Sequence, residues 1–379
     1  MKKYFLLVVS LLGSSLIACS PTTPNGSSLS VEQPSEAIKY EETLYSNPLS
    51  VKQDGHNYSR EIADPTIVDG ENGYYYIVST ERKMLRSENL VDWEVISENM
   101  ISTPTWGSEL YPNPGPKYVW APDLKKINDT WILYYSLSGT DQPYGVGYAT
   151  ADDVEGPYVD QGKLFDYQEI GIENAIDPQI YIEDDGLIYM VVGSYRGVFL
   201  IELEEDGQSL YGGVEYQNEN KVLIAGREGR WDATTFEGGY ITKKDDTYYF
   251  FGSSGLSCEK EQSDYKVHVG KSDSLFGPYV DSKGKKLTGG TYYSSTIGEL
   301  VLISPSNKKT VGPGHNSIFI DDAGDYWIYY HAYYEYDNYN TRHLFIDKLE
   351  WNEQGFPYVN TKRPSFETEL AGPRMFLEE

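Results

Sequence analysis

Residues 64–79 read DPTIVDGENGYYYIVS, a short apolar run, a turn rich in Asp, Gly and Asn, and then an aromatic run. Two such runs around a turn of this composition are typical of a β-hairpin. The same arrangement returns four more times along the chain, and in each unit the second run begins ten positions after the first residue. The five units begin at Asp64, Ala121, Asp177, Glu237 and His315.

Further short strands follow inside the units, and helical periodicity is nearly absent from residue 60 onward. Radially repeated sheets of four short strands form a β-propeller. We therefore predict an all-β fold, a five-bladed β-propeller in which each blade is a four-stranded antiparallel sheet. A stacked β-sandwich is the alternative, but a sandwich does not require five copies in one register.

The charge of the chain limits its partners. It has 379 residues, with 31 Lys and Arg against 58 Asp and Glu, and a formal net charge of −27. Affinity for nucleic acid comes mainly from cationic side chains on phosphates, so this charge excludes a nucleic-acid partner and disfavours a polyanionic substrate. A neutral polysaccharide or oligosaccharide is compatible with it, and we expect a monomer.

The first residues predict an export signal. Lys2 and Lys3 precede an apolar run at residues 4–17, and residues 16–19 read LIAC. A short apolar run behind basic residues is typical of a signal peptide, and LIAC resembles the bacterial lipoprotein box. That resemblance implies a signal peptide over residues 1–18 and a lipid on Cys19. A plain secretion signal with an incidental cysteine is the alternative.

The expected domain boundaries follow from composition. Residues 19–45, rich in Ser, Thr, Pro, Asn and Glu, predict a flexible tether, and residues 46–379 the propeller. The mature protein would then lie outside the cytoplasm and touch the membrane through its lipid anchor only. Because the lipid would consume Cys19, Cys258 would remain alone and no intramolecular disulfide could form.

The first positions of the units predict a catalytic site. In a propeller the opening strands line the central channel in the same direction, so Asp64, Asp177 and Glu237 should meet at one end of it. Three converging carboxylates raise one another's pKa, and an acid–base pair of carboxyl groups is what cleavage of a glycosidic bond requires. An Asp before Pro can simply cap a turn, but Glu237 has no following Pro. No zinc-protease spacing of His and Glu completes a transition-metal site.

The motifs around these residues resemble one family. The stretches ADP at 63–65, AIDP at 175–178 and FEG at 236–238 are similar to the three catalytic motifs of glycoside hydrolase family 43, over residues 60–360. WAPD at 120–123 and GPGHNS at 312–317 are similar to the endo-α-1,5-L-arabinanases within it. The resemblance implies a propeller enzyme that inverts the anomeric configuration. Base and acid carboxyls would then lie about 6.5–9.5 Å apart.

The resemblance also assigns roles. It implies that Asp64 is the general base, that Glu237 is the general acid, and that Asp177 orients Glu237 and modulates its pKa. It implies that His315 ligates a calcium ion, mostly through water, at the channel. His56, His268, His331 and His343 lack a ligand pattern and are interpreted as structural, although His331 could lie near the channel.

Further candidates and alternatives concern the substrate. We expect Trp120, Asn174, Ser194 and Tyr195 to bind sugar, with blade packing as the other interpretation of each. Two departures from the family pattern are Arg196 in place of Trp and Gly238 in place of Ala after the acid. The preferred function is hydrolysis of α-1,5-linked L-arabinan. The alternatives are an exo-acting α-L-arabinofuranosidase or β-xylosidase of the same family, and a non-catalytic glycan-binding surface lipoprotein.

Overall fold

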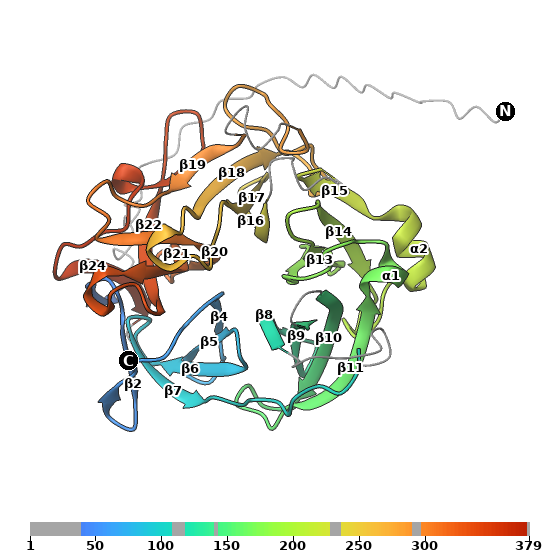
Figure 1. The fold of residues 1–379 in the computed structure, drawn as a ribbon, viewed down its shortest axis with the longest axis horizontal. Helices are drawn as coiled ribbons and strands as arrows, with labels where there is room; N and C mark the ends of the chain where they lie inside the picture. Colours follow the sequence, from blue (N-terminus) through green and yellow to red (C-terminus); the bar gives the residue numbers. More distant parts are fainter. Residues whose placement is uncertain (1–38, 108–117, 140–142, 228–235, 290–296, 377–379) are drawn as a thin grey trace, which may run out of the picture. The chain divides into compact units, whose positions relative to one another are not determined.

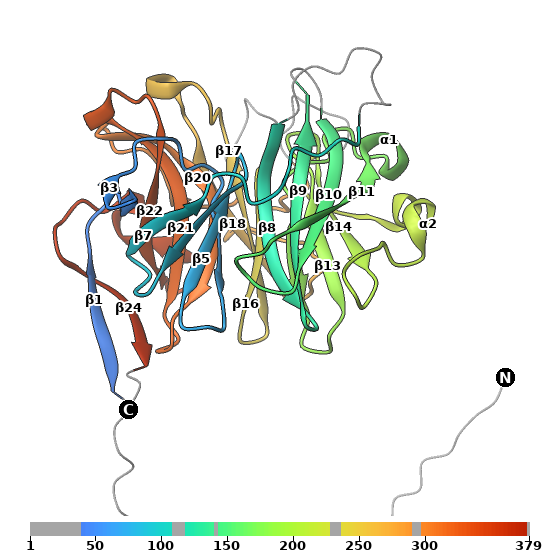
Figure 2. The ribbon, with the colours of Figure 1, turned by 90° about the horizontal axis from the view of Figure 1, so that it is seen from below.

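The computed structural model describes residues 39–107, 118–139, 143–227, 236–289 and 297–376. In the described residues, five sheets of at least four strands surround a common axis (Figure 1), and a sixth sheet has two strands. The side view in Figure 2 shows the strands of neighbouring sheets standing side by side. The predicted five-bladed propeller is therefore confirmed. The predicted signal peptide, Cys19 and residues 20–38 of the expected tether lie outside the described residues.

Each blade contains four consecutive antiparallel strands. Blade one consists of β4 (Thr66–Asp69), β5 (Tyr75–Ser79), β6 (Lys83–Ser87) and β7 (Asp92–Ser97). Blade two consists of β8 (Tyr118–Ile127), β9 (Thr130–Ser138), β10 (Pro143–Ala151) and β11 (Val159–Asp166). Blade three consists of β12 (Gln179–Ile182), β13 (Ile188–Val192), β14 (Val198–Leu203) and β15 (Val222–Ala225). Blade four consists of β16 (Glu237–Lys244), β17 (Thr247–Ser254), β18 (Lys266–Ser272) and β19 (Glu299–Leu302). Blade five consists of β20 (Thr310–Ile320), β21 (Tyr326–Tyr334), β22 (Arg342–Trp351) and β23 (Pro357–Val359).

Elements outside the repeat were not foreseen from the sequence. Blade one is extended by β2 (Ser50–Gln53), which pairs in parallel with β7, and by β3 (His56–Asn57). The last six residues of the expected tether form β1 (Tyr40–Tyr45), which pairs with β24 (Leu370–Phe376). The short helices are α1 (Tyr167–Ile170), α2 (Gly213–Asn220), η1 (Lys260–Gln262), η2 (Glu335–Asp337) and η3 (Asn360–Lys362). Over the described part of the chain, no helix has the length and apolar character needed to cross a membrane.

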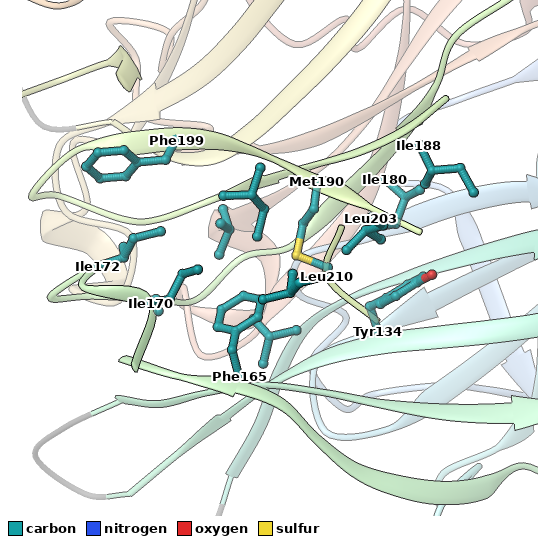
Figure 3. Close-up of a cluster of buried hydrophobic side chains, with 14 of the residues drawn as sticks. Tyr134, Phe165, Ile170, Ile172, Ile180, Ile188, Met190, Phe199, Leu203 and Leu210 are labelled. Carbon is teal, nitrogen blue, oxygen red and sulfur yellow. The ribbon is translucent and has the colours of Figure 1, made fainter. Parts of the chain in front are cut away.

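The hydrophobic core lies between blades. Between blades two and three, Tyr134 and Phe165 pack with Ile180, Met190 and Phe199 (Figure 3). An equivalent cluster joins blade five to blade one and contains Ile67, Ile77, Trp327, Tyr329 and Leu344. Each fully buried side chain of this size contributes roughly 1.5–3 kcal/mol by leaving water. The propeller is thus closed by apolar packing between its first and last blades, and this closure holds the opening strands at the axis.

Candidate active site

A left-handed backbone residue opens each blade. The φ angles are 53° at Asp64, 38° at Ala121, 61° at Asp177 and 49° at His315. In the fourth blade the residue with positive φ is Gly238, at 56°. The prediction that Glu237 occupies the equivalent repeat position is therefore wrong by one residue.

The cause is the length of the first hairpin. Thr66 pairs with Val78 in blade one, as Gln179 pairs with Val191 and Ser317 with Tyr329 in blades three and five. In blades two and four the matching pairs are Asp123 with Tyr134 and Tyr240 with Phe251, so these hairpins are one residue shorter. Counting ten positions back from Thr247, four residues before Phe251, therefore stops one residue too early, whereas counting from Trp131, three residues before Tyr134, reaches Ala121.

Gly238 is required by its surroundings. A Cβ atom there would lie 2.9 Å from Cγ of His315, and φ is in the left-handed region. Its N–H donates to Oδ2 of Asp177 over 3.1 Å. The departure from the family pattern at this position therefore makes room for the His315 ring and ties the acid motif to Asp177.

The predicted site residues lie together. Asp64, Asp177, Glu237 and His315 line one cavity of about 900 Å³, and the expected sugar-binding residues line the same cavity. The three carboxyl side chains are largely buried. The structure thus brings together every candidate that the repeat placed at the channel mouth, although Glu237 arrives there from a neighbouring position.

Asp64 is surrounded by donors. Its Oδ1 lies 3.1 Å from Nδ1 of His315 and 3.9 Å from Nη1 of Arg342, and Thr80 donates its hydroxyl to Oδ2. Burial alone would raise the pKa of Asp64, but the charge and hydrogen bond of His315 outweigh it and hold this pKa well below its usual range. Asp64 is therefore ionised.

Asp177 and Glu237 have the opposite electrostatics. Burial, with the charges of Glu237 and Asp64, raises the pKa of Asp177 to about 7. Burial also raises the pKa of Glu237. Glu237 accepts hydrogen bonds from Ser194 at Oε2 (2.9 Å) and Tyr195 at Oε1 (2.8 Å). The cavity therefore holds one ionised carboxylate and two carboxyl groups that retain protons more readily.

The expected sugar-binding residues divide into two pairs. Ser194 and Tyr195 hold Glu237, so their first role in this structure is to fix the acid. Trp120 stacks on Tyr118 with ring centroids 6.0 Å apart, and Asn174 donates to the Ser194 carbonyl over 3.1 Å. Trp120 and Asn174 are both only partly buried, so they remain available to a ligand.

Calcium prefers oxygen ligands, so a calcium site near His315 would need several oxygen atoms that point to one position. Among the residues that the structure describes, no group of three or more His, Cys, Asp or Glu side chains is placed to hold a metal ion. Burial lowers the pKa of His315, but Asp64 outweighs this effect and raises it to about 9. His315 is thus a protonated partner of Asp64. These residues do not form a calcium cage, and they fit only a cation that is held chiefly by water.

Three residues at the site were missed as functional candidates: Thr80, His331 and Arg342. His331 is fully buried, and its Nδ1 accepts the N–H of Asp64 over 3.1 Å. Arg342 joins Glu61 to Asp64. A signal for two of them was present, because Thr80 and His331 are the polar residues that follow the aromatic run of their units.

A five-bladed propeller whose channel mouth holds an ionised carboxylate beside protonatable ones is built for acid–base hydrolysis of glycosides. Comparison with known proteins agrees with this class. The model of the glycosyl hydrolases family 43 matches residues 58–357. The chain belongs to this family and is a glycoside hydrolase.

Individual relatives differ in their named activity. An extracellular exo-α-(1→5)-L-arabinofuranosidase of Cellvibrio japonicus is 30% identical, over 80% of this chain and 87% of that enzyme. An extracellular endo-α-(1→5)-L-arabinanase of Thermotoga petrophila is 27% identical, over 83% of this chain and 75% of that enzyme. The α-L-arabinanase of Cellvibrio cellulosa, solved with arabinohexaose, superposes with a TM-score of 0.69 at 28% identity and covers 80% of this chain and 97% of its own.

Proposed function

We propose that the protein hydrolyses α-1,5-linked L-arabinan with inversion of configuration, as an endo-arabinanase. The observation that carries the proposal is the cavity of about 900 Å³ in which ionised Asp64 lies with Asp177 and Glu237, whose pKa values are raised. A cavity of this volume accommodates several sugar residues. The named activities of the relatives supply the sugar and the linkage.

The proposed mechanism assigns one step to each carboxyl group. Asp64, ionised beside His315, accepts a proton from the attacking water. Glu237, protonated because of its burial, donates a proton to the leaving oxygen. Asp177 accepts the N–H of Gly238 and so holds the backbone beside the acid, and in its ionised form it favours the protonated form of Glu237. Trp120 and Asn174 are proposed to contact the sugar chain, because aromatic faces pack on sugar rings.

The exo mode is the second candidate, favoured by the named activity of the Cellvibrio japonicus relative. Product analysis on linear arabinan separates the two modes. An endo enzyme releases a range of oligosaccharides early, whereas arabinose as the sole early product would contradict the endo mode. Branched arabinan, arabinoxylan and nitrophenyl xyloside test the remaining specificities. A chain that binds arabinan oligosaccharides but cleaves none of these substrates would contradict hydrolysis altogether.

We also propose that a calcium ion binds beside His315, chiefly through water. The His315 proton and a calcium ion would compete for the negative field of Asp64, Asp177 and Glu237, so His315 would face the ion in its neutral form. Calorimetric titration of the metal-free protein with Ca²⁺ tests the site directly. We expect binding to the wild type and none to the His315→Ala variant, and equal binding by the two proteins would contradict the assignment.

We propose that the protein is exported and anchored by a lipid on Cys19, as a monomer. The relatives named extracellular support export, and LIAC at residues 16–19 supports the anchor. In the Cys19→Ala variant the protein should leave the membrane fraction. Unchanged membrane association of this variant would contradict the lipid anchor, and the mass in solution by light scattering tests the monomer.

A further inference from the structure

Successive blades are joined by one repeated hydrogen bond near the axis. The N–H of the left-handed residue that opens a blade donates to a side chain at the end of the second strand of the preceding blade. The four bonds are Ala121 N–H to Thr80 Oγ1 (2.9 Å), Asp177 N–H to Ser136 Oγ (2.8 Å), His315 N–H to Ser253 Oγ (2.8 Å) and Asp64 N–H to His331 Nδ1 (3.1 Å). We call Thr80, Ser136, Ser253 and His331 the latch residues.

The fifth junction departs from this pattern at the acid. The Ser194 hydroxyl, which follows the second strand of blade three, donates to Oε2 of Glu237 (2.9 Å). The N–H of Gly238 instead donates to Oδ2 of Asp177 (3.1 Å). At this junction the side chain of the preceding blade holds the reactive carboxyl group itself, and at two others it holds the backbone of Asp64 or Asp177.

The latch bonds act where the backbone is costly to maintain. A non-glycine residue with positive φ costs on the order of 1–3 kcal/mol and persists only when its surroundings over-determine it. Asp64 and Asp177 both have this conformation, with φ of 53° and 61°. Because the N–H and the Cα–Cβ bond belong to the same residue, a fixed N–H also restrains the direction of the Cα–Cβ bond from which the carboxyl group extends.

His331 is the latch residue at the closure of the propeller. Its ring is fully buried and lies parallel to the ring of Tyr265, with centroids 5.9 Å apart and planes 7° apart. Nδ1 also lies 3.3 Å from Oδ1 of Asp64. Because Nδ1 accepts the Asp64 N–H, it carries no proton and does not also donate to this carboxylate, so the stacked ring holds the base through its backbone. The junction that closes the fold and the junction that positions the base are the same.

We propose that Ser136 and His331 are positioning residues, which hold Asp177 and Asp64 in their reactive orientation through a backbone N–H. The inference rests on hydrolysis and not on the choice of sugar, so it is tested on whichever substrate the wild type cleaves fastest. Failure of the proposed arabinan specificity would change that substrate and would leave the comparison between variants intact.

The molecule offers a matched control. The Tyr240 hydroxyl donates to the Ile318 carbonyl (3.2 Å), which is also a buried bond between consecutive blades. Ser136→Ala and Tyr240→Phe each delete one oxygen atom from one such bond. Both should lower the melting temperature to a similar extent, but only Ser136→Ala loosens a residue that carries a predicted catalytic carboxyl group.

The experiment measures kcat, KM and melting temperature for Ser136→Ala, His331→Ala, His331→Asn and Tyr240→Phe. We expect Ser136→Ala and His331→Ala to lose kcat by about tenfold to a hundredfold, as for a misplaced catalytic group, with KM changed by less than about twofold. His331→Asn should recover most of the loss, because the Asn Oδ1 can occupy the position of Nδ1 and accept the same N–H.

Tyr240→Phe should retain kcat within about twofold. Equal kcat values for Ser136→Ala and Tyr240→Phe at equal stability would show that the Ser136 bond contributes to stability only, and this result would overturn the proposal. If His331→Asn is no more active than His331→Ala, the nitrogen acceptor is not what His331 contributes, and its assignment fails. If His331→Ala does not fold, the comparisons of Ser136→Ala with Tyr240→Phe and of His331→Asn with the wild type decide.

Discussion

Glu237→Gln is the substitution that most directly tests the assignment of the acid, and the structure indicates that the variant folds. Ser194 donates to Oε2 of Glu237, and Tyr195 donates to Oε1 while lying 3.1 Å from the Gly255 carbonyl. A glutamine that places its oxygen toward Ser194 and its NH₂ toward Tyr195 keeps both contacts. The tyrosine hydroxyl can accept from the amide and donate to Gly255, so the Ser194 and Tyr195 hydroxyls both keep a partner.

The expected loss follows from the chemistry of the leaving group. General acid catalysis contributes about 10²–10⁴-fold, or roughly 2.7–5.4 kcal/mol at about 1.36 kcal/mol for each tenfold change. Glu237→Gln should therefore lower kcat on arabinan by this factor while the affinity for oligosaccharide is kept. A nitrophenyl leaving group departs without a proton, so the loss should be much smaller on a nitrophenyl glycoside. Asp64→Asn, which removes the base, should lose activity on both substrates.

The assay compares reducing-sugar release from linear arabinan with nitrophenol release from a nitrophenyl arabino-oligosaccharide. Calorimetry with an unlabelled arabino-oligosaccharide reports binding. Undiminished turnover of arabinan by Glu237→Gln would remove this residue from the mechanism. An equal loss on both substrates would show that Glu237 does not protonate the leaving group, and Asp177 would then become the candidate acid.

Three further predictions follow from the same geometry. Burial raises the pKa of Glu237, and the hydrogen bond from the Tyr195 hydroxyl opposes that effect. Tyr195→Phe should therefore move the alkaline limb of the kcat/KM profile to higher pH. An alkaline limb that stays in place or moves to lower pH would contradict this coupling. Gly238→Ala should destabilise the fold in urea by about 1–3 kcal/mol and should also lower activity. At Gly324, φ is 80° and nothing lies within 4 Å, so Gly324→Ala should retain activity. Equal effects of the two variants on activity would exclude a special role for Gly238. Burial raises the pKa of Asp347 to about 7, so the folded state binds this proton more tightly than the unfolded state and stability should fall as pH rises from about 4 to 7. Asp347→Asn should therefore gain up to about 4 kcal/mol of unfolding free energy at pH 8 and less than about 1 kcal/mol at pH 4, and a pH-independent effect in urea unfolding would contradict it.

The blades could be predicted from the sequence because each repeats one local pattern. The alternation of apolar runs with Asp, Gly and Asn turns depends only on neighbouring residues, and it recurs in every unit. Strand β1 and its pairing with β24 could not be predicted in this way. Their partners lie at opposite ends of the chain, and neither segment belongs to the repeat. The parallel pairing of β2 with β7 was missed because β2 precedes the first unit and is not part of the repeat.

The site was predictable to within one residue. Asp64, Asp177 and His315 were correctly placed at equivalent positions because their hairpins have equal length. Glu237 was displaced by one position, because the hairpin of blade four is one residue shorter while its aromatic run still begins four residues before the matching position. In blade two the same shortening is offset by a run that begins one residue later. The partners of the acid were misjudged more strongly. Ser194 and Tyr195 have the composition expected of sugar contacts, and only three-dimensional geometry shows that their hydroxyls point to Glu237.

A repeated backbone cannot by itself produce an acid and a base, because equivalent positions receive equivalent environments. Asp64 and Asp177 illustrate how the fold resolves this, since both open a blade with positive φ and both are buried. The difference comes from their neighbours. Asp64 lies within hydrogen-bond distance of the cationic His315. Asp177 accepts the Gly238 N–H, and burial together with the charges of Glu237 and Asp64 outweighs the effect of His315 on its pKa. The acid then lies one residue outside the repeat, where Ser194 is free to bond it directly. Fivefold similarity therefore brings the carboxyl groups together, and the departures from it separate their pKa values so that one can accept a proton and another can donate one.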